Sequence, residues 1–247
     1  MRLSIVILTC NQRDITFRCL NALRYQYNRG DVEIIVVDNG SDDGTVEAVE
    51  AGFPDVRLIA NQENRGVSFG RNQGLRMAQG DKILILDNDT VPDDEAINTM
   101  CRWLDDNAST GIVACRLTDP QGNTQDSFKP YPGLIVKISN LLHRGKKRHV
   151  ELPSEPVYPD YVIGACQMFR RSLLFEIGML DEHIFYGPED ADFCLRARNA
   201  GYSITYLPHI SMVHDWRRAT TRRILSRLGR RHISALFYLY RKHRRLF

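Results

Sequence analysis

Several features that would assign the chain to a secreted or membrane class are missing. The 247 residues contain no apolar run near the roughly 18 that a membrane-spanning helix needs. The apolar stretch at the start is too short for a secretion signal, and no Cys-x-x-Cys pair is present. We therefore expect a cytoplasmic protein whose cysteines are reduced, buried and free of zinc. The six cysteines are Cys10, Cys19, Cys101, Cys115, Cys166 and Cys194.

Repeats, low-complexity stretches and two common nucleotide-binding motifs are also absent. The 17 glycines and 10 prolines show no periodic bias, and 43% apolar residues suffice for a core of ordinary size. No Gly-x-x-x-x-Gly-Lys-Ser/Thr loop and no Gly-x-Gly-x-x-Gly loop follows the first apolar segment. This disfavours P-loop and nicotinamide-dependent enzymes.

Acidic residues are missing from one part of the chain. The formal net charge is +3, but residues 216–247 hold 11 Lys and Arg and no acid, whereas residues 1–215 hold 22 basic and 30 acidic groups. An acidic body with a basic tail predicts an anionic partner for the tail.

Apolar and amphipathic segments alternate through the first half of the chain. We expect strands at residues 3–8, 32–37, 56–60, 82–86 and 111–117. We expect helices near residues 13–26, 44–52, 67–79 and 93–106. This order predicts an α/β fold, a Rossmann-like sheet covered by helices on both faces.

The second half is less regular. Residues 118–160 are rich in proline, glycine and polar residues and predict an insertion with a short helix at 133–142. We then expect a strand at 161–169, a helix at 188–200, a strand at 203–207 and a helical tail. We divide the chain into a body of residues 1–215, with halves 1–117 and 118–215, and a tail of residues 216–247.

Polar residues follow the expected parallel strands. Thr9 and Asn11 end the first strand, Asp38 ends the second, and Asp87, Asn88 and Asp89 follow a later one. In open α/β sheets, ligands bind beyond the carboxyl ends of the strands. The Asp38 carboxylate could accept a hydrogen bond from a ribose or base, or it could simply hold an Asx turn before the next helix.

Asp87 and Asp89 form the sharpest of these patterns. Two carboxylates at i and i+2 after an extended strand can share a hard divalent cation such as Mg²⁺ or Mn²⁺. Such a cation would bridge the oxygens of a diphosphate. A bare surface turn is the alternative. The location of Asp87 and Asp89 beside two other polar strand ends favours the metal site.

Two further segments carry candidate groups. Gly66 and Arg71 stand at the start of an expected helix, where main-chain amides and a guanidinium suit a diphosphate, although ordinary helix starts also contain glycine. Glu189 and Asp190 begin another helix, where acids compensate the helix dipole or supply a general base. His214 follows an apolar stretch and is either a nitrogen ligand of the metal or a buried core histidine.

Taken in order, these segments resemble the family 2 glycosyltransferases, which have the GT-A fold. The resemblance covers residues 3–218 roughly. The stretches that carry it are IVILTCNQ, IIVVDNGSDDGT, NRGVSFGRNQGL, LILDNDT, VIGACQMFRRSLLFEIGMLDE, YGPEDADFCLRARNAGY and the His214 region. Residues 178–182, the segment EDADFCLR and the arginine-rich tail are most similar to bacterial rhamnosyltransferases.

The resemblance implies a role for each matching residue. Residues implied to hold the nucleoside are Thr9, Asn11 and Asp38. Residues implied to contact or lie under the diphosphate and donor sugar are Gly66, Arg71, Asn72, Asp87, Asn88, Gly164 and Ala165. Residues implied to bind the metal are Asp87, Asp89 and His214. Residues implied to include the catalytic base are Asp190 and, as the next candidate, Glu189.

The implied activity is inverting, metal-dependent sugar transfer. The donor is a nucleotide sugar, with dTDP-L-rhamnose preferred and a UDP-sugar as the alternative, because Cys10 departs from the family pattern near the nucleobase. The acceptor is a saccharide or lipid-linked saccharide of a surface polysaccharide. The resemblance leaves open whether the protein is an oligomer.

Two other function classes fit the sequence less well. A sugar nucleotidyltransferase should have a glycine-rich basic loop after the first strand, and residues 9–14 hold no glycine. A nucleic-acid-binding module should have a basic body, and this body is acidic.

The tail is expected to bind an anionic membrane at its cytoplasmic face. The alternative is that its apolar stripe packs on the body and leaves the arginines in solvent. The stripe consists of Ile224, Leu225, Leu228, Leu236, Leu239 and Tyr240.

Overall fold

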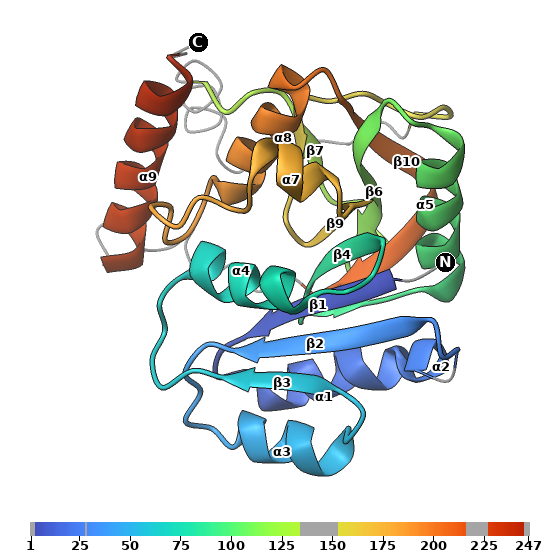
Figure 1. Cartoon of the computed structure of the whole chain (residues 1–247), viewed down its shortest axis with the longest axis vertical. Coiled ribbons are helices and arrows are strands. Elements are labelled where there is room, and N and C mark those ends of the chain that lie inside the picture. Colours follow the sequence, from blue (N-terminus) through green and yellow to red (C-terminus); the bar gives the residue numbers. More distant parts are fainter. Residues whose placement is uncertain (1–2, 28, 134–152, 216–226, 245–247) are drawn as a thin grey trace.

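A mixed sheet forms the centre of the protein (Figure 1). The computed structural model describes residues 3–27, 29–133, 153–215 and 227–244. The strands of the sheet are β1 (Leu3–Thr9), β2 (Val32–Asp38), β3 (Arg57–Ala60), β4 (Lys82–Asp87), β5 (Thr90–Val91), β6 (Thr110–Thr118), β9 (Cys166–Arg170) and β10 (Ser203–His214). A separate ribbon pairs β7 (Phe128–Lys129) with β8 (Tyr161–Val162).

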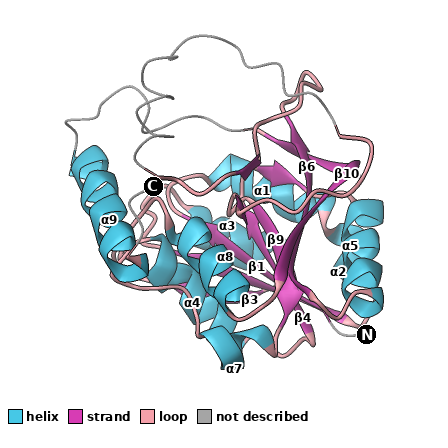
Figure 2. Ribbon diagram, turned by 90° about the horizontal axis from the view of Figure 1, so that it is seen from above, coloured by secondary structure: helices cyan, strands magenta, loops and turns pink. Residues whose placement is uncertain are grey.

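Helices cover both faces of this sheet (Figure 2). They are α1 (Arg13–Ala22), α2 (Arg24–Tyr27), α3 (Thr45–Gly52), α4 (Val67–Met77), α5 (Asp94–Asp106), α7 (Leu173–Ile177), α8 (Glu189–Asn199) and α9 (Arg227–His243). Alternate side chains of β1 enter opposite layers. Ile5 and Ile7 pack with α1, α3 and α5, whereas Val6 packs with α4, α7 and α8. The continuous apolar runs of the inner strands follow from this two-sided burial.

The strand order is β3-β2-β1-β4-β9-β6-β10-β5. The first four strands are parallel, with Thr9 opposite Asp38 and Leu8 opposite Asp87. Their carboxyl ends are therefore level and meet at one edge. β9 is antiparallel to both β4 and β6, and β10 runs parallel to β6. The short β5 is antiparallel to the end of β10, so His214 lies opposite Thr90.

The expected parallel strands and their helices are confirmed, and three expectations need correction. The expected strand at 161–169 is two strands, because β8 pairs with β7, while β9 pairs with β4 and β6. The expected strand at 203–207 continues to His214 after a register shift against β6 at Leu207. The expected helix at 13–26 is divided into α1 and α2.

The tail forms α9, which stands at the periphery of the molecule in both views (Figures 1 and 2). Leu239 and Tyr240 are buried and pack with Tyr131 and Leu195, and Leu236 packs against the same cluster. These three α9 residues were expected to face a membrane, but they face the protein because its surface supplies matching apolar partners.

Two sequence expectations fall outside the described residues: most of the helix at 133–142, and Ile224 and Leu225 of the tail stripe. Among the described residues, the structure contains no helix with the length and apolar character needed to cross a bilayer.

Candidate active site

The loops that follow β1 and β2 form one hydrogen-bonded unit. Asn11 adopts a left-handed backbone conformation, with φ of 53°. Its amide N–H donates to Ser41 Oγ at 2.8 Å, and its side-chain Oδ1 accepts the N–H of Asp42 at 2.8 Å. The Asn11 side chain, implied to hold the nucleoside, therefore joins the two loops that would surround it.

Asp38 is fully buried and holds a turn. Its carboxylate accepts the N–H groups of Gly40 at 3.1 Å and Ser41 at 2.8 Å, together with the Ser41 hydroxyl at 2.5 Å. The Asx-turn interpretation therefore describes its local role. Contact with a nucleoside stays a prediction.

Asn88 points back into the fold. Its amide donates to the hydroxyls of Thr9 at 3.1 Å and Thr16 at 2.9 Å, and the two hydroxyls lie 2.7 Å apart. All three side chains are buried. The family resemblance implies that Asn88 and Thr9 contact the nucleotide-sugar donor. In the structure, their hydrogen bond fixes the turn between Asp87 and Asp89. Thr16 lies in α1, where the sequence gave no sign of this contact.

Asp87, Asp89 and His214 bring their ligand atoms together within 4.8 Å of one another. Asp87 ends β4, Asp89 follows it, and His214 ends β10. The side chains of Asp87 and Asp89 are 34% and 17% exposed, so both reach toward solvent, while that of His214 is 4% exposed. A pair of carboxylates and an imidazole is a donor set that suits Mn²⁺ or Mg²⁺.

Gln125 orients His214. The Gln125 side chain donates to the His214 carbonyl at 2.7 Å and presents Oε1 to His214 Nδ1 at 2.7 Å. This contact favours the proton on Nδ1, so Nε2 presents its lone pair 3.2 Å from Asp89 Oδ1. Burial lowers the pKa of His214, but Asp89 and then Asp87 raise it to a net value above normal. The site thus attracts a positive charge between Nε2 and the carboxylates.

Arg71 is a buried bridge between the two acidic clusters. It lies 2.5 Å from Asp87 Oδ1 through Nη2 and 3.4 Å from Glu189 Oε1 through Nη1, and Nη2 also donates to the Gly164 carbonyl at 3.0 Å. Its side chain is 5% exposed. A Cβ on Gly164 would lie 2.6 Å from Arg71 Nη1, so any other residue there would have to displace the Arg71 guanidinium.

The two acids at the start of α8 differ in availability. Glu189 is buried, pairs with Arg71 and accepts the N–H of Gly187 at 2.8 Å. Burial and then the adjacent Asp190 raise the pKa of Glu189 to about 7. Asp190 is only partly buried, and accepts main-chain N–H groups from Ala191 at 2.6 Å and Gly164 at 3.2 Å. Burial raises the pKa of Asp190 despite these bonds.

Asn72 and Gly66 anchor a loop, and their implied place near the diphosphate stays a prediction. The side chain of Asn72 is buried. It donates to the Leu180 carbonyl at 2.8 Å and accepts the Leu180 N–H at 3.0 Å. A Cβ on Gly66 would lie 2.7 Å from Phe185. Both residues therefore hold the loop of residues 178–187 that leads to α8. Ala165 is buried beside Asp87, and its carbonyl accepts the N–H of Asp87 at 3.1 Å.

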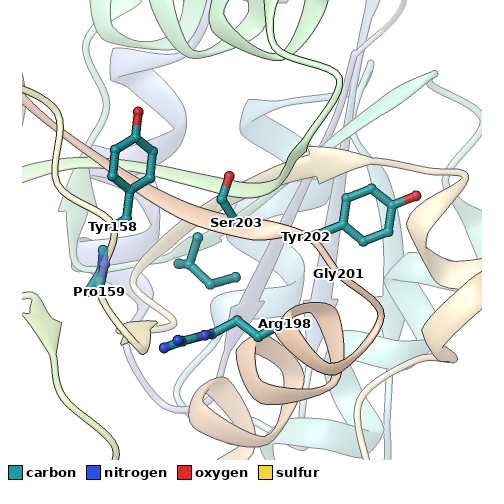
Figure 3. Close-up of a pocket in the computed structure, with 7 residues that line it drawn as sticks. Tyr158, Pro159, Arg198, Gly201, Tyr202 and Ser203 are labelled. Carbon is teal, nitrogen blue, oxygen red and sulfur yellow. The ribbon is translucent and has the colours of Figure 1, made fainter.

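A shallow pocket of about 320 Å³ lies elsewhere (Figure 3). It is lined by Tyr158, Pro159, Arg198, Gly201, Tyr202, Ser203 and Ile204. Arg198 belongs to the last turn of α8, whereas Asp190 is in the first turn. This pocket is therefore separate from the acidic clusters.

Sequence comparison relates the chain to known glycosyltransferases. The glycosyl transferase family 2 profile matches residues 4–178. The chain is 26% identical over 238 residues to N-acetylglucosaminyl-diphospho-decaprenol L-rhamnosyltransferase of Mycobacterium tuberculosis, covering 86% of this chain and 76% of that protein. It is 27% identical over 212 residues to dTDP-rhamnosyl transferase RfbF of Shigella flexneri, covering 85% and 67%.

Solved structures share the fold. The mannosyltransferase PcManGT from Pyrobaculum calidifontis, in complex with GDP-Man and Mn²⁺, matches with a TM-score of 0.69 and 22% identity over 98% of this chain and 64% of that chain. Staphylococcus aureus TarS 1–349 matches with a TM-score of 0.64 and 18% identity over 87% and 60%. The chain spans less than two thirds of either. The fold is the expected GT-A type, and the chain belongs to glycosyl transferase family 2, as a glycosyltransferase similar to bacterial rhamnosyltransferases.

Proposed function

We propose that this protein transfers a sugar from a nucleotide-sugar donor to a saccharide acceptor, with inversion at the anomeric carbon and with a divalent cation. One observation carries the proposal. Asp87, Asp89 and His214 converge within 4.8 Å, and Arg71 joins this cluster to the pair of acids that starts α8. Arg71 thereby holds the proposed metal ligands and the candidate base in a fixed position relative to each other.

The residues present fit Mg²⁺ or Mn²⁺. Three carboxylates, those of Asp87, Glu189 and Asp190, lie around one buried guanidinium, and Asp89 adds a further carboxylate beside Asp87, which leaves an excess of acidic groups. Asp87, Asp89 and His214 would hold the cation. When bound, it would neutralise negative charge on the diphosphate that leaves the sugar.

Asp190 is the proposed general base. Glu189 is buried and occupied by Arg71 and Gly187, whereas Asp190 is only partly buried and bonds to main-chain N–H groups alone. The acceptor hydroxyl attacks the anomeric carbon from the face opposite the nucleotide and its proton passes to Asp190. The bond from that carbon to the diphosphate oxygen breaks, and the configuration inverts in one step.

The names of two relatives support a proposal for the donor and the acceptor. Two of them are named as rhamnosyltransferases, one for a diphospho-decaprenol-linked substrate and one for dTDP-rhamnose. We infer dTDP-L-rhamnose as donor and a lipid-linked saccharide as acceptor, in surface polysaccharide synthesis at the cytoplasmic side of the membrane. A UDP-sugar is the alternative donor.

A panel of nucleotide sugars tests this proposal. We expect dTDP-L-rhamnose, in the presence of Mn²⁺ or Mg²⁺, to raise the melting temperature and to release dTDP when an N-acetylglucosaminyl lipid acceptor is added. The matched control is the Asp89→Ala protein. Release of a different nucleotide would show that another nucleotide sugar is the donor. If no nucleotide sugar stabilised the protein with either metal, the proposed function would be refuted.

A further inference from the structure

The outward face of α9 carries apolar and basic side chains together. Ile233 and Phe237 are 41% and 65% exposed, and Arg230 and Arg241 are exposed on either side of them. At about 100° per residue these four side chains share one face of the helix, opposite the fully buried Leu239. The helix therefore has an inner face packed on the protein and a second, outer amphipathic surface.

Ion pairs hold the inner face in place. Asp192 of α8 is fully buried and lies 2.8 Å from both Lys242 Nζ and His243 Nε2. Asp181 accepts the Tyr238 hydroxyl at 2.9 Å and lies 2.7 Å from Lys242 Nζ. Because these contacts converge on one side of α9, they fix its rotation and keep the outer face directed away from the body.

This helix lies along the loop that leads to the proposed base. The Arg231 guanidinium stands 3.8 Å from the centre of the Phe185 ring, and the rings of His232 and Tyr186 are 6.4 Å apart. Phe185 and Tyr186 directly precede the start of α8. The side of α9 that carries Arg231 and His232 therefore contacts the loop that leads to Asp190.

We propose that the outer face of α9, formed by Arg230, Ile233, Phe237 and Arg241, binds an anionic lipid membrane. Aromatic and aliphatic side chains enter the interface while arginines pair with lipid phosphates. Charge favours this occupant, because residues 216–247 contain 11 basic residues and no acid. The inference goes beyond the proposed sugar transfer, since none of these four residues belongs to the acidic clusters.

Other occupants fit this face less well. A second copy of α9 docked face to face would place arginines against arginines. A nucleic acid would be repelled by the body, with 30 acidic and 22 basic residues, and would leave Ile233 and Phe237 without an apolar environment. Both remain as outcomes that the experiment distinguishes.

The test is co-sedimentation of the full chain with phosphatidylcholine vesicles that contain or lack phosphatidylglycerol. We expect binding only to the anionic vesicles. Ile233→Gln/Phe237→Gln and Arg230→Gln/Arg241→Gln should each lower the partition coefficient about 10-fold or more. Added salt should weaken binding of the wild-type protein.

Matched controls use exposed residues elsewhere. Phe175→Gln removes an apolar side chain that is 79% exposed on α7, and Arg102→Gln removes an exposed arginine of α5. Both should bind vesicles like wild type, and circular dichroism melting should show every variant folded. The proposal fails if wild type does not sediment with anionic vesicles or if the α9 variants sediment like the controls. It also fails if those variants lose polynucleotide binding or self-association instead.

Discussion

The guanidinium of Arg71 lies 2.5 Å from the Asp87 carboxylate, and the two residues come from different elements of the candidate active site. Arg71 comes from α4, on one face of the sheet, whereas Asp87 ends β4. The same guanidinium reaches Glu189 of α8 at 3.4 Å. One buried cation thus balances part of the charge of both acidic clusters and fixes the distance between the proposed metal site and base.

Asp190→Asn should lower kcat by about 10²–10⁴-fold, because the amide keeps the shape but cannot accept the proton. The dissociation constant for the nucleotide sugar should stay within a few-fold. Steady-state kinetics with saturating acceptor and calorimetric donor titration measure the two effects. Glu50→Gln, an exposed acid of α3, serves as control. Near-normal turnover of Asp190→Asn would show that Asp190 is not the general base and would make Glu189 the next candidate.

Asp89→Ala should abolish tight Mn²⁺ binding, because it removes one of the converging carboxylates. Turnover and donor affinity should fall together, since the cation both positions the diphosphate and favours its departure. Isothermal titration with Mn²⁺ and assays in excess chelator measure this. Asp14→Ala, whose carboxylate is largely exposed on α1, is the control. Full activity in chelator would contradict the metal assignment.

Gln125→Leu should weaken Mn²⁺ affinity about 10–100-fold, although Gln125 is not itself a proposed ligand, because His214 loses the partner that orients its ring. The measurement is Mn²⁺ titration of the nucleotide-free protein. Gln121→Leu, an exposed glutamine in the same segment, should leave the affinity unchanged. Equal affinities for the two variants would show that Gln125 has no orienting role.

Glu189→Gln should flatten the pH dependence of stability. The folded protein has a raised pKa of about 7 at Glu189, against 4.5 in the unfolded chain. Between these values the folded state holds a proton that the unfolded state has lost, so the free energy of unfolding falls as pH rises from about 4.5 to 7. The wild type should lose up to about 3 kcal/mol more than the variant over this range.

Urea unfolding in chelator at a series of pH values between 4.5 and 8 measures the difference. Glu50→Gln is again the control. Parallel curves for wild type and Glu189→Gln would show that this carboxyl does not titrate with a raised pKa.

Asp192→Asn should destabilise the protein by about 1.5–3 kcal/mol, because it removes a fully buried carboxylate that pairs with Arg196 and Lys242 and bonds to His243 Nε2. Protection of α9 amides in hydrogen exchange should fall at the same time. Asp105→Asn is the control, since Asp105 pairs with Lys82 while its side chain is 54% exposed. Unchanged protection of α9 would mean that Asp192 does not anchor the helix.

The sequence by itself determined the central strands and the acids that follow them. The runs at β1, β2 and β4 are apolar at nearly every position, which is sufficient to predict a buried parallel sheet, and level carboxyl ends follow from parallel pairing. Asp87, Asp89 and Asp190 could be singled out because acids directly after an apolar strand or at a helix start are local patterns.

Only the tertiary structure decided which polar groups already have hydrogen-bond partners within the protein. Asn72 and Asn88 were assigned to the donor, but their amides bond to Leu180 and to Thr9 and Thr16, partners that lie far away in the sequence. Gln125 gave no signal, because its position in an irregular segment has no periodicity to interpret. Such contacts depend on how distant loops meet.

The tertiary structure likewise decided which face of the tail helix packs on the body. Its sequence contains two surfaces with apolar residues, one around Leu239 and one with Ile233 and Phe237, and amphipathic periodicity alone cannot choose between them. Two carboxylates on the body, the partly buried Asp181 and the fully buried Asp192, pair with Lys242 and turn the Leu239 face inward. Because these acids belong to another part of the chain, the choice could not be read from the helix itself.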